Sequence, residues 1–269
     1  MRNLPGKIAY ARKMLEATPG APPLGTFAVR TAIWRLRTAM ELGTSVDITP
    51  SHFKLYCPPE WRGNAKMNYL MRDALEPEIA ALPAFVGEGD LVIDVGAHYG
   101  LYTLVFASLV GGDGDVYAFE PSPHAMNVVS RNVSTNGLSN VVTLVNGAAA
   151  ETDGTASFWE HADPSRASLG PSPESVNQVE VKTCRIDREL AGRTRPVSFI
   201  KIDVEGFELG VLKGAESVIS KDRPVVLLED DNAITSAAGE VPGAAIQFLR
   251  DHGYAIRVGQ GRNSWAIPR

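Results

Sequence analysis

The chain has 269 residues, of which 44% are hydrophobic and 21% are charged, so it can bury a sizeable core and is not a disordered tail. Its net charge of −5 argues against a general nucleic-acid-binding protein, and its two cysteines are too few for a disulfide scaffold. No apolar run approaches the ~18 residues that span a bilayer, and the N-terminus lacks the apolar region of a secretory signal. We therefore expect a soluble, cytoplasmic protein with no transmembrane segment and no nucleic-acid partner.

The charge is unevenly distributed along the chain. Residues 1–66 contain ten Lys or Arg against four Asp or Glu, a net charge of +6. The remainder contains sixteen against twenty-seven, a net charge of −11. This asymmetry predicts a basic helical arm over residues 1–69 and a main domain over residues 70–269.

Two helices are predicted in the arm. The first covers residues 8–17, and Pro and Gly residues follow it. The second covers residues 27–42 and is amphipathic, since apolar side chains recur on one face at helical spacing: Val29, Ile33, Leu36 and Met40. Such a helix can pack on the body, form a homodimer contact or lie on a membrane surface, and its basic face can attract an anionic acceptor.

The body alternates short apolar runs with helix-length segments. After a helix over 69–82, strands are predicted at Leu91–Val95, Val116–Phe119, Val141–Val145, Val179–Thr183, Phe199–Ile202 and Val225–Leu228. The intervening helices are predicted over 102–109, 125–136 and 206–220. Strands that alternate with helices form βαβ units and a mostly parallel, doubly wound α/β sheet. Ligands of such folds bind beyond the carboxyl ends of the strands, so the site is expected there.

A glycine loop follows the first of these body strands. The segment from Leu91 to Gly100 reads LVIDVGAHYG. Gly96 has no Cβ, so the backbone can approach a ligand closely, and the free N–H groups of the next helix suit an anion or carboxylate. The dinucleotide fingerprint is G-x-G-x-x-G, but His98 occupies its middle glycine position. The loop is more typical of a nucleoside-sulfonium site than of a pyrophosphate site; a plain tight turn is the alternative.

An acid ends the second body strand. Glu120 lies 24 residues after Gly96, where a carboxylate can accept hydrogen bonds from both ribose hydroxyls. Pro121 then fixes the chain as it turns. The pairing of this acid with the glycine loop indicates a nucleoside site. The alternative is a carboxylate that is exposed to solvent at the strand end, which is common.

Acids also follow the last two predicted strands: Asp203, Glu205 and Glu208, then Glu229, Asp230 and Asp231. Carboxylates at neighbouring strand ends can converge on one cleft, where they act as a general base for a hydroxyl or hold a divalent metal. We assign Asp203 and Glu205 to the site. Glu208 is expected to open a helix, and Asp230 and Asp231 to be solvated.

Seven segments of the body match those of a known family: VIDVGAHYGLYTL (92–104), YAFEPSP (117–123), NVSTNGLSNV (132–141), SLG (168–170), TCRIDREL (183–190), FIKIDVEGFELGVLKGA (199–215) and RPVVLLE (223–229). They resemble the FkbM-type S-adenosylmethionine-dependent methyltransferases from about Glu76 to Tyr254. The resemblance implies a class I methyltransferase fold, a Rossmann-like fold with a mostly parallel seven-stranded sheet, an antiparallel last strand and helices on both faces. It also implies S-adenosyl-L-methionine as cofactor and methyl transfer to oxygen of a sugar, glycan or secondary metabolite.

The resemblance assigns the cofactor-binding residues, which lie in the loops beyond the strand ends. They are Glu76, Asp94, Gly96, Ala97, His98, Gly100, Tyr102, Thr103, Glu120, Pro121, Ser122, Asn146, Gly147, Ala148 and Asp203. Within this set, Tyr102 and Thr103 are expected near the methionine carboxylate and Asn146 near adenine. His98 departs from the family pattern, which usually has Asn at this position.

The reaction implied by the resemblance is an in-line displacement at the sulfonium methyl group. The cofactor is already activated, so the protein mainly supplies position and desolvation. An aliphatic hydroxyl is a poor nucleophile, and a general base is expected; the candidates are Asp203, Glu205 and His161. His161 lies in the Ser- and Pro-rich stretch Glu160–Gln178, which is either a mobile lid over the acceptor or an ordinary long loop.

Three alternatives stay open. Strand-end acids hold magnesium in some sugar O-methyltransferases, but we assign no metal ligands here. A nicotinamide-dependent oxidoreductase is a second alternative, against which the missing middle glycine argues. A non-catalytic, methyltransferase-like binding module is the third, and the intact Asp94, Gly96, Glu120 and Asp203 argue against it.

Overall fold

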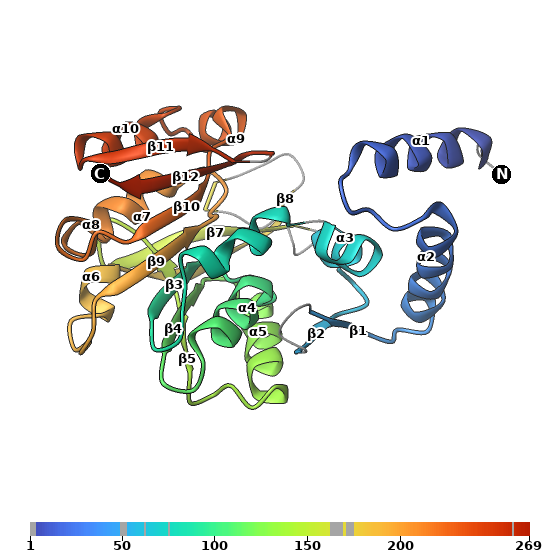
Figure 1. Ribbon diagram of the computed structural model, residues 1–269, viewed down its shortest axis with the longest axis horizontal. Coiled ribbons are helices and arrows are strands. Elements are labelled where there is room, and N and C mark those ends of the chain that lie inside the picture. Colours follow the sequence, from blue (N-terminus) through green and yellow to red (C-terminus); the bar gives the residue numbers. More distant parts are fainter. Residues whose placement is uncertain are drawn as a thin grey trace.

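The computed structural model describes residues 4–48, 53–61, 63–74, 76–161, 169–170, 175–259 and 261–269. A seven-stranded sheet forms the centre of the body, and helices cover both of its faces (Figure 1). The N-terminal arm projects to one side of this body. None of the described helices combines the length and the apolar character that are needed to cross a membrane.

The number and the directions of the strands match the expected sheet. From one edge to the other the strands are β11 (Tyr254–Val258), β12 (Asn263–Pro268), β10 (Val225–Glu229), β9 (Val197–Ile202), β3 (Leu91–Val95), β4 (Asp115–Glu120) and β5 (Val142–Asn146). β12 pairs antiparallel with both of its neighbours, and the other adjacent pairs are parallel. The predicted mostly parallel sheet with an antiparallel last strand is therefore confirmed.

Two hydrophobic cores lie on opposite faces of the sheet. Every residue of β3 is buried, as expected of a central strand covered on both faces. Its alternate side chains enter different cores, because Val92 belongs to the first and Ile93 to the second. The first core contains residues of α4 (Leu101–Val110) and α5 (Pro123–Thr135). The second contains residues of the helices α6 (Ile186–Glu189), α7 (Glu208–Gly214), α8 (Glu216–Lys221) and α10 (Ala244–Asp251).

Three predicted elements differ from the observed ones. The helix expected over 69–82 is instead α3 (Asn64–Met71) followed by two short 3₁₀ helices, η1 (Arg72–Ala74) and η2 (Pro77–Ala84). Proline cannot continue an α-helix, and Pro77 and Pro83 lie within this stretch. The helix expected over 206–220 is interrupted at Ala215, between α7 and α8.

The third difference is the strand expected at Val179–Thr183, which lies outside the main sheet. It belongs to β8 (Ser175–Cys184), which pairs with β6 (Ala148–Ala149) and β7 (Gly154–His161) in a separate three-stranded sheet. Both ends of the predicted loop over 160–178 are therefore strand. Residues 162–168 and 171–174 of that loop lie outside the described residues.

The arm consists of α1 (Leu4–Ala17), α2 (Leu24–Ala39) and a hairpin of β1 (Thr44–Asp47) and β2 (Lys54–Cys57), followed by α3. Arm residues such as Leu55 and Trp61 are fully buried and belong to the same core as α4 and α5. Two asparagine side chains fix the hairpin, one within α5 and one at the C-cap of that helix. Asn132 bonds to the backbone N and O of Tyr56, at 2.8 and 3.1 Å, and Asn136 bonds to the same atoms of Lys54, both at 2.9 Å.

Candidate active site

The glycine loop is held between the ends of three strands. The backbone amides of Gly96 and Ala97 both donate to the carbonyl oxygen of Phe119, at 3.0 Å. Gly96 has a φ of +78°, and a Cβ on it would lie 1.9 Å from the carbonyl oxygen of Asp203. Only glycine fits here, because the backbones beyond β3 and β9 approach each other too closely for a side chain. This packing places the Asp203 segment directly beside the loop.

Glu120 connects the loop to the end of β4. Its side chain is buried, and its two carboxylate oxygens accept hydrogen bonds from the backbone amides of Ser122, at 2.8 Å, and His98, at 2.7 Å. Burial raises the pKa of Glu120 to about 7, although the two amide hydrogen bonds oppose this shift. Each carboxylate oxygen can accept a further hydrogen bond, so the acid still has acceptor capacity for a ribose hydroxyl.

The residues expected at the adenine end lie beside Glu120. Asn146 ends β5, is exposed, and is the register partner of Glu120. Gly147 and Ala148 are buried. A Cβ on Gly147 would lie 3.1 Å from the carbonyl oxygen of Lys182, so this glycine lets β8 pack against the loop. Of these three residues, Asn146 is therefore the one with a side chain available to a ligand.

Asp94 and Thr103 contact each other beneath the loop. Both side chains are fully buried, and the Thr103 hydroxyl donates to Asp94 Oδ2 at 2.6 Å. Burial raises the pKa of Asp94, while nearby Lys201 opposes the shift. This buried pair thus supports the glycine loop, and the Thr103 hydroxyl donates its proton to Asp94 rather than to a ligand. The His98 ring likewise packs on the arm, because it stacks on Trp61 with 4.4 Å between the ring centroids.

Lys201 is a central residue that sequence reasoning missed. Its Nζ lies 3.3 Å from Asp203 Oδ2 and 3.9 Å from Asp94 Oδ1, and it donates to the carbonyl oxygen of Gly96 at 3.4 Å. Burial disfavours its charge, but the neighbouring carboxylates outweigh burial and raise its pKa. The signal was available in the sequence, since a lysine inside the apolar run FIKI is expected to have a buried partner.

Glu76 and Tyr102 form the floor of the same region. The Tyr102 hydroxyl donates to Glu76 Oε2 at 3.2 Å, and Lys201 Nζ lies 5.1 Å from the Tyr102 ring centroid. Burial raises the pKa of Glu76 to about 7. The role of Glu76 was left undetermined by its sequence, and its position now places it with Lys201 and Asp203.

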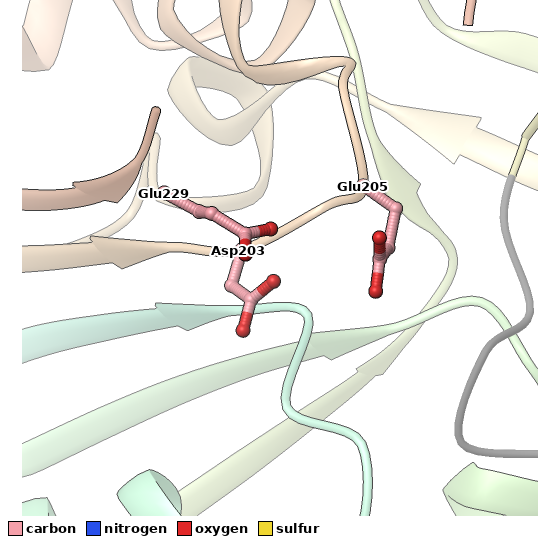
Figure 2. A group of neighbouring side chains, drawn as sticks. All are labelled: Asp203, Glu205 and Glu229. Carbon is pink, nitrogen blue, oxygen red and sulfur yellow. The ribbon is translucent and has the colours of Figure 1, made fainter. Parts of the chain in front are cut away.

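Three acids from the ends of β9 and β10 converge. Asp203, Glu205 and Glu229 each offer a carboxylate oxygen, and these oxygens lie within 4.8 Å of one another (Figure 2). The Asp203 side chain is 46% exposed, whereas the Glu229 side chain is 9% exposed. Asp203 and Glu205 were predicted, but Glu229 was not. Basic groups lie beside this cluster, because Lys201 contacts Asp203 and Arg262 lies 3.0 Å from Glu229 Oε1.

These acids have different affinities for protons. Burial raises the pKa of Glu229 to about 8, and the neighbouring carboxylates of Asp203 and Glu205 add to the shift. Burial would also raise the pKa of Asp203, but Lys201 and a hydrogen bond from Glu229 outweigh it, so the pKa lies below the usual range. Near neutral pH the cluster therefore combines an ionised Asp203 with a Glu229 that is mostly protonated and that ionises as the pH rises through about 8.

A cavity of about 580 Å³ opens beside the acids. Five carboxyl groups and two basic side chains are among its described lining residues: Glu76, Glu78, Asp203, Glu205, Glu229, Lys201 and Arg262. The turn between α1 and α2, at Ala17–Pro19, forms part of its rim. Even without Glu229, which is mostly protonated at neutral pH, the other four carboxyl groups outnumber the two basic side chains, and this excess favours a cationic ligand group.

The remaining acids and His161 lie elsewhere. Asp231 caps α9 (Asn232–Ala237) by accepting from the backbone amides of Ala233 and Ile234. Glu208 opens α7 and accepts from the Gly206 amide at 3.0 Å. His161 is buried at the end of β7 and is not among the described residues that line the acidic cavity.

The raised pKa values make stability depend on pH. Glu76, Glu120 and Glu229 have pKa values of about 7, 7 and 8 in the folded state, above the ordinary value of 4.5. Because these groups bind protons more tightly in the folded state than in the unfolded state, protonation stabilises the folded protein. This stabilisation is complete at pH values below the ordinary pKa of 4.5 and is lost as the pH rises through about 7–8. We expect the melting temperature without cofactor to fall by at least about 5 °C between about pH 6 and about pH 9. Thermal unfolding across this range measures it, and a constant or rising melting temperature would contradict it.

Comparison with known proteins identifies the family. The Methyltransferase FkbM domain matches residues 94–256. The protein-L-isoaspartate O-methyltransferase of Aeropyrum pernix is 32% identical over 136 residues, which are 46% of this chain and 49% of that protein. The 31-O-demethyl-FK506 methyltransferase FkbM of Streptomyces tacrolimicus is 27% identical over 199 residues, 62% of this chain and 74% of that protein. The hexuronic acid methyltransferase AglP of Haloferax volcanii is 27% identical over 141 residues, which are 52% of this chain and 56% of that protein.

The matched regions do not extend over the whole of these relatives. The chain spans about half the length of the relatives from A. pernix and H. volcanii. The family model, in contrast, starts at Asp94 and covers the glycine loop, Glu120 and all three clustered acids. The resemblance seen in the sequence is thus confirmed at the level of the family and of its class I fold. The chain belongs to the FkbM family of S-adenosylmethionine-dependent methyltransferases.

Proposed function

We propose that the protein transfers the methyl group of S-adenosylmethionine to a hydroxyl oxygen of a sugar, glycan or secondary-metabolite acceptor. The observation that carries this proposal is the juxtaposition of the glycine loop with the acid cluster. The Gly96 backbone lies against the backbone of Asp203, whose carboxylate shares one set of converging oxygens with Glu205 and Glu229. A cofactor on the loop and an acceptor at the acids would therefore be neighbours.

The residues present fit this cofactor. Glu120 has acceptor capacity for ribose, and Asn146 presents an exposed amide next to it. The carboxylates of the cavity outnumber its basic groups, which suits the ammonium and sulfonium charges at the methionine end. S-adenosylmethionine, when bound, supplies an activated methyl group, so the chain's own task is to position the acceptor oxygen and remove its proton.

Glu229 is the residue that we propose as general base. A base works best when its pKa lies near the working pH, and the pKa of Glu229 is about 8. Asp203 is a weaker base because Lys201 stabilises its ionised form, and we propose that it orients the methionine end. Glu205 is proposed to contact the acceptor. The names of the relatives from S. tacrolimicus and H. volcanii, a 31-O-demethyl compound and hexuronic acid, support an oxygen acceptor.

Glu120→Gln is expected to weaken S-adenosylmethionine binding by roughly 10–100-fold. The amide would direct N–H groups at the Ser122 or His98 backbone amide, which both need an acceptor. Calorimetric titration measures the change, and Glu88→Gln, an exposed change before β3, is the matched control. Equal affinities of the two variants would contradict the assignment.

The proposed reaction is tested by a screen with methyl-labelled S-adenosylmethionine against sugars, glycans and hydroxylated metabolites, with and without a chelator. We expect label on a hydroxyl oxygen. Cofactor binding without transfer to any acceptor would favour the non-catalytic module, and binding of a nicotinamide dinucleotide instead would favour the oxidoreductase. Loss of transfer on chelation would show that magnesium is needed, and the clustered carboxylate oxygens are ligands of the kind that this ion takes.

A further inference from the structure

The outer surface of α2 is apolar and uncovered. Eight exposed residues form it, and we call them the arm face: Gly25, Ala28, Val29, Ala32, Ile33, Leu36, Ala39 and Met40. The four large side chains among them are between 43% and 63% exposed. They include the whole stripe that the sequence predicted, so the stripe does not pack on the body. The helix lies on the outside of the arm (Figure 1).

Contacts on the opposite side fix the orientation of α2. Trp34 is buried and lies 5.4 Å from the Tyr69 ring of α3, measured between ring centroids. Arg30 donates to the carbonyl oxygen of Leu70 at 2.8 Å, and Arg37 donates to that of Gly43. These contacts use the polar and aromatic side of the helix. The arm face is therefore held outward and cannot turn into the core without breaking them.

Basic residues outnumber acids on the two arm helices. The charged residues of α2 are three arginines, of which Arg35 is exposed, and α1 exposes Arg12 and Lys13 beside one acid, Glu16. Arg35 and Lys66 lie close enough that the pKa of Lys66, which burial lowers, is lowered further by Arg35. α1 also exposes Ile8 and Tyr10, at 46% and 73%. An apolar helical face with a basic border and an exposed tyrosine is typical of helices that lie in a lipid headgroup region.

Charge also distinguishes between the two occupants that an apolar face can have. Packing α2 against α2 of a second copy would add the exposed Arg35 of each helix to the interface, and neither α2 contains an acid to pair with it. Anionic lipid headgroups instead complement that charge, while acyl chains cover the apolar side chains. The observations therefore favour lipid over a second copy.

The arm face is connected to the acidic cavity. The turn after α1, at Ala17–Pro19, lines the same cavity as Asp203 and Glu229. We propose that the arm face docks on an anionic lipid bilayer and brings the cavity to a hydroxyl acceptor that is attached to a lipid. The docking is independent of the reaction, whereas the identity of the acceptor rests on the proposed function.

Vesicle flotation with the full chain tests the docking. The vesicles contain phosphatidylcholine alone, or phosphatidylcholine with about a third phosphatidylglycerol. We expect binding to the anionic vesicles only, weakened by salt, and a loss of at least about tenfold for Ile33→Asp and Leu36→Asp. Val258→Asp, at a body residue that is 87% exposed, is the matched control and is expected to bind normally. Unchanged melting temperatures show that the variants are folded.

Several results would overturn the docking. They are no flotation of the wild-type protein with anionic vesicles, equal loss for the Val258 control, or a dimer by light scattering that Leu36→Asp converts to monomer without any vesicle binding. Because flotation needs neither cofactor nor turnover, its failure is separate from failure of the proposed reaction. With docking established, faster methylation of a lipid-attached hydroxyl than of its water-soluble analogue is expected, and equal rates would overturn the acceptor assignment.

Discussion

Replacing Glu229 by Gln is expected to lower the turnover number by about 10²–10⁴-fold. Glu229 is buried at the acid cluster, where its neutral isostere keeps the shape of the side chain but cannot accept a proton. In the wild-type protein, kcat/KM is expected to rise with pH as Glu229 ionises and to level off above about pH 8. The residual rate of the variant should lack this rise. Steady-state rates with labelled cofactor, taken as a pH profile, measure both effects.

The matched control is Glu216→Gln, at an exposed glutamate on α8. It should leave the rate and its pH profile unchanged. Because Glu229 also contacts Arg262, cofactor affinity and melting temperature are measured in parallel to separate a lost base from a disturbed site. A Glu229→Gln protein that binds cofactor and keeps both the wild-type rate and the wild-type pH profile would refute Glu229 as the base and return the role to Asp203 or Glu205.

Gly96→Ala is expected to destabilise the protein by about 3 kcal/mol or more and to reduce S-adenosylmethionine affinity by at least about 100-fold. The new Cβ would lie 1.9 Å from the carbonyl oxygen of Asp203, and the φ of +78° is unfavourable for alanine. The loop and the Asp203 segment must therefore separate, which moves two parts of the site at once. Denaturant unfolding and calorimetric titration measure the two effects.

Gly87→Ala provides the control for this substitution. A Cβ at position 87 meets no atom within 4 Å, and its backbone does not have a positive φ. We expect wild-type affinity and a stability within about 0.5 kcal/mol of the wild type. If Gly96→Ala behaved like this control, the close approach of the two backbones would not be a feature of the folded protein.

Much of the sheet could be predicted because its strands are continuous apolar runs. Leu91–Val95 is buried along its whole length, so its composition alone distinguishes it from its surroundings. The C-terminal strands β11 and β12 were missed because they are partly exposed and have mixed composition. β8 was predicted as a strand but not as part of a second sheet, since the pairing partners of a strand depend on distant residues.

The site was predictable where a loop motif carries it and not where separate strands assemble it. Asp203 and Glu205 follow from the string KIDVEG, whereas Glu229 joins them through the parallel pairing of β9 with β10. Arg262 comes from the segment between β11 and β12, far from the motifs in sequence. Such contacts depend on strand order and register, which the local pattern does not contain.

The asparagine contacts of the hairpin have a consequence for association between chains. β2 pairs with β1 along one edge, and on the other edge the side-chain amides of Asn132 and Asn136 occupy the backbone N–H and C=O groups of Tyr56 and Lys54. A strand whose outer backbone groups are already satisfied is a poor template for strand addition. These two side chains thus occupy the hydrogen-bonding groups at the open edge of the hairpin, so that this edge is protected against strand pairing with another chain without a third strand.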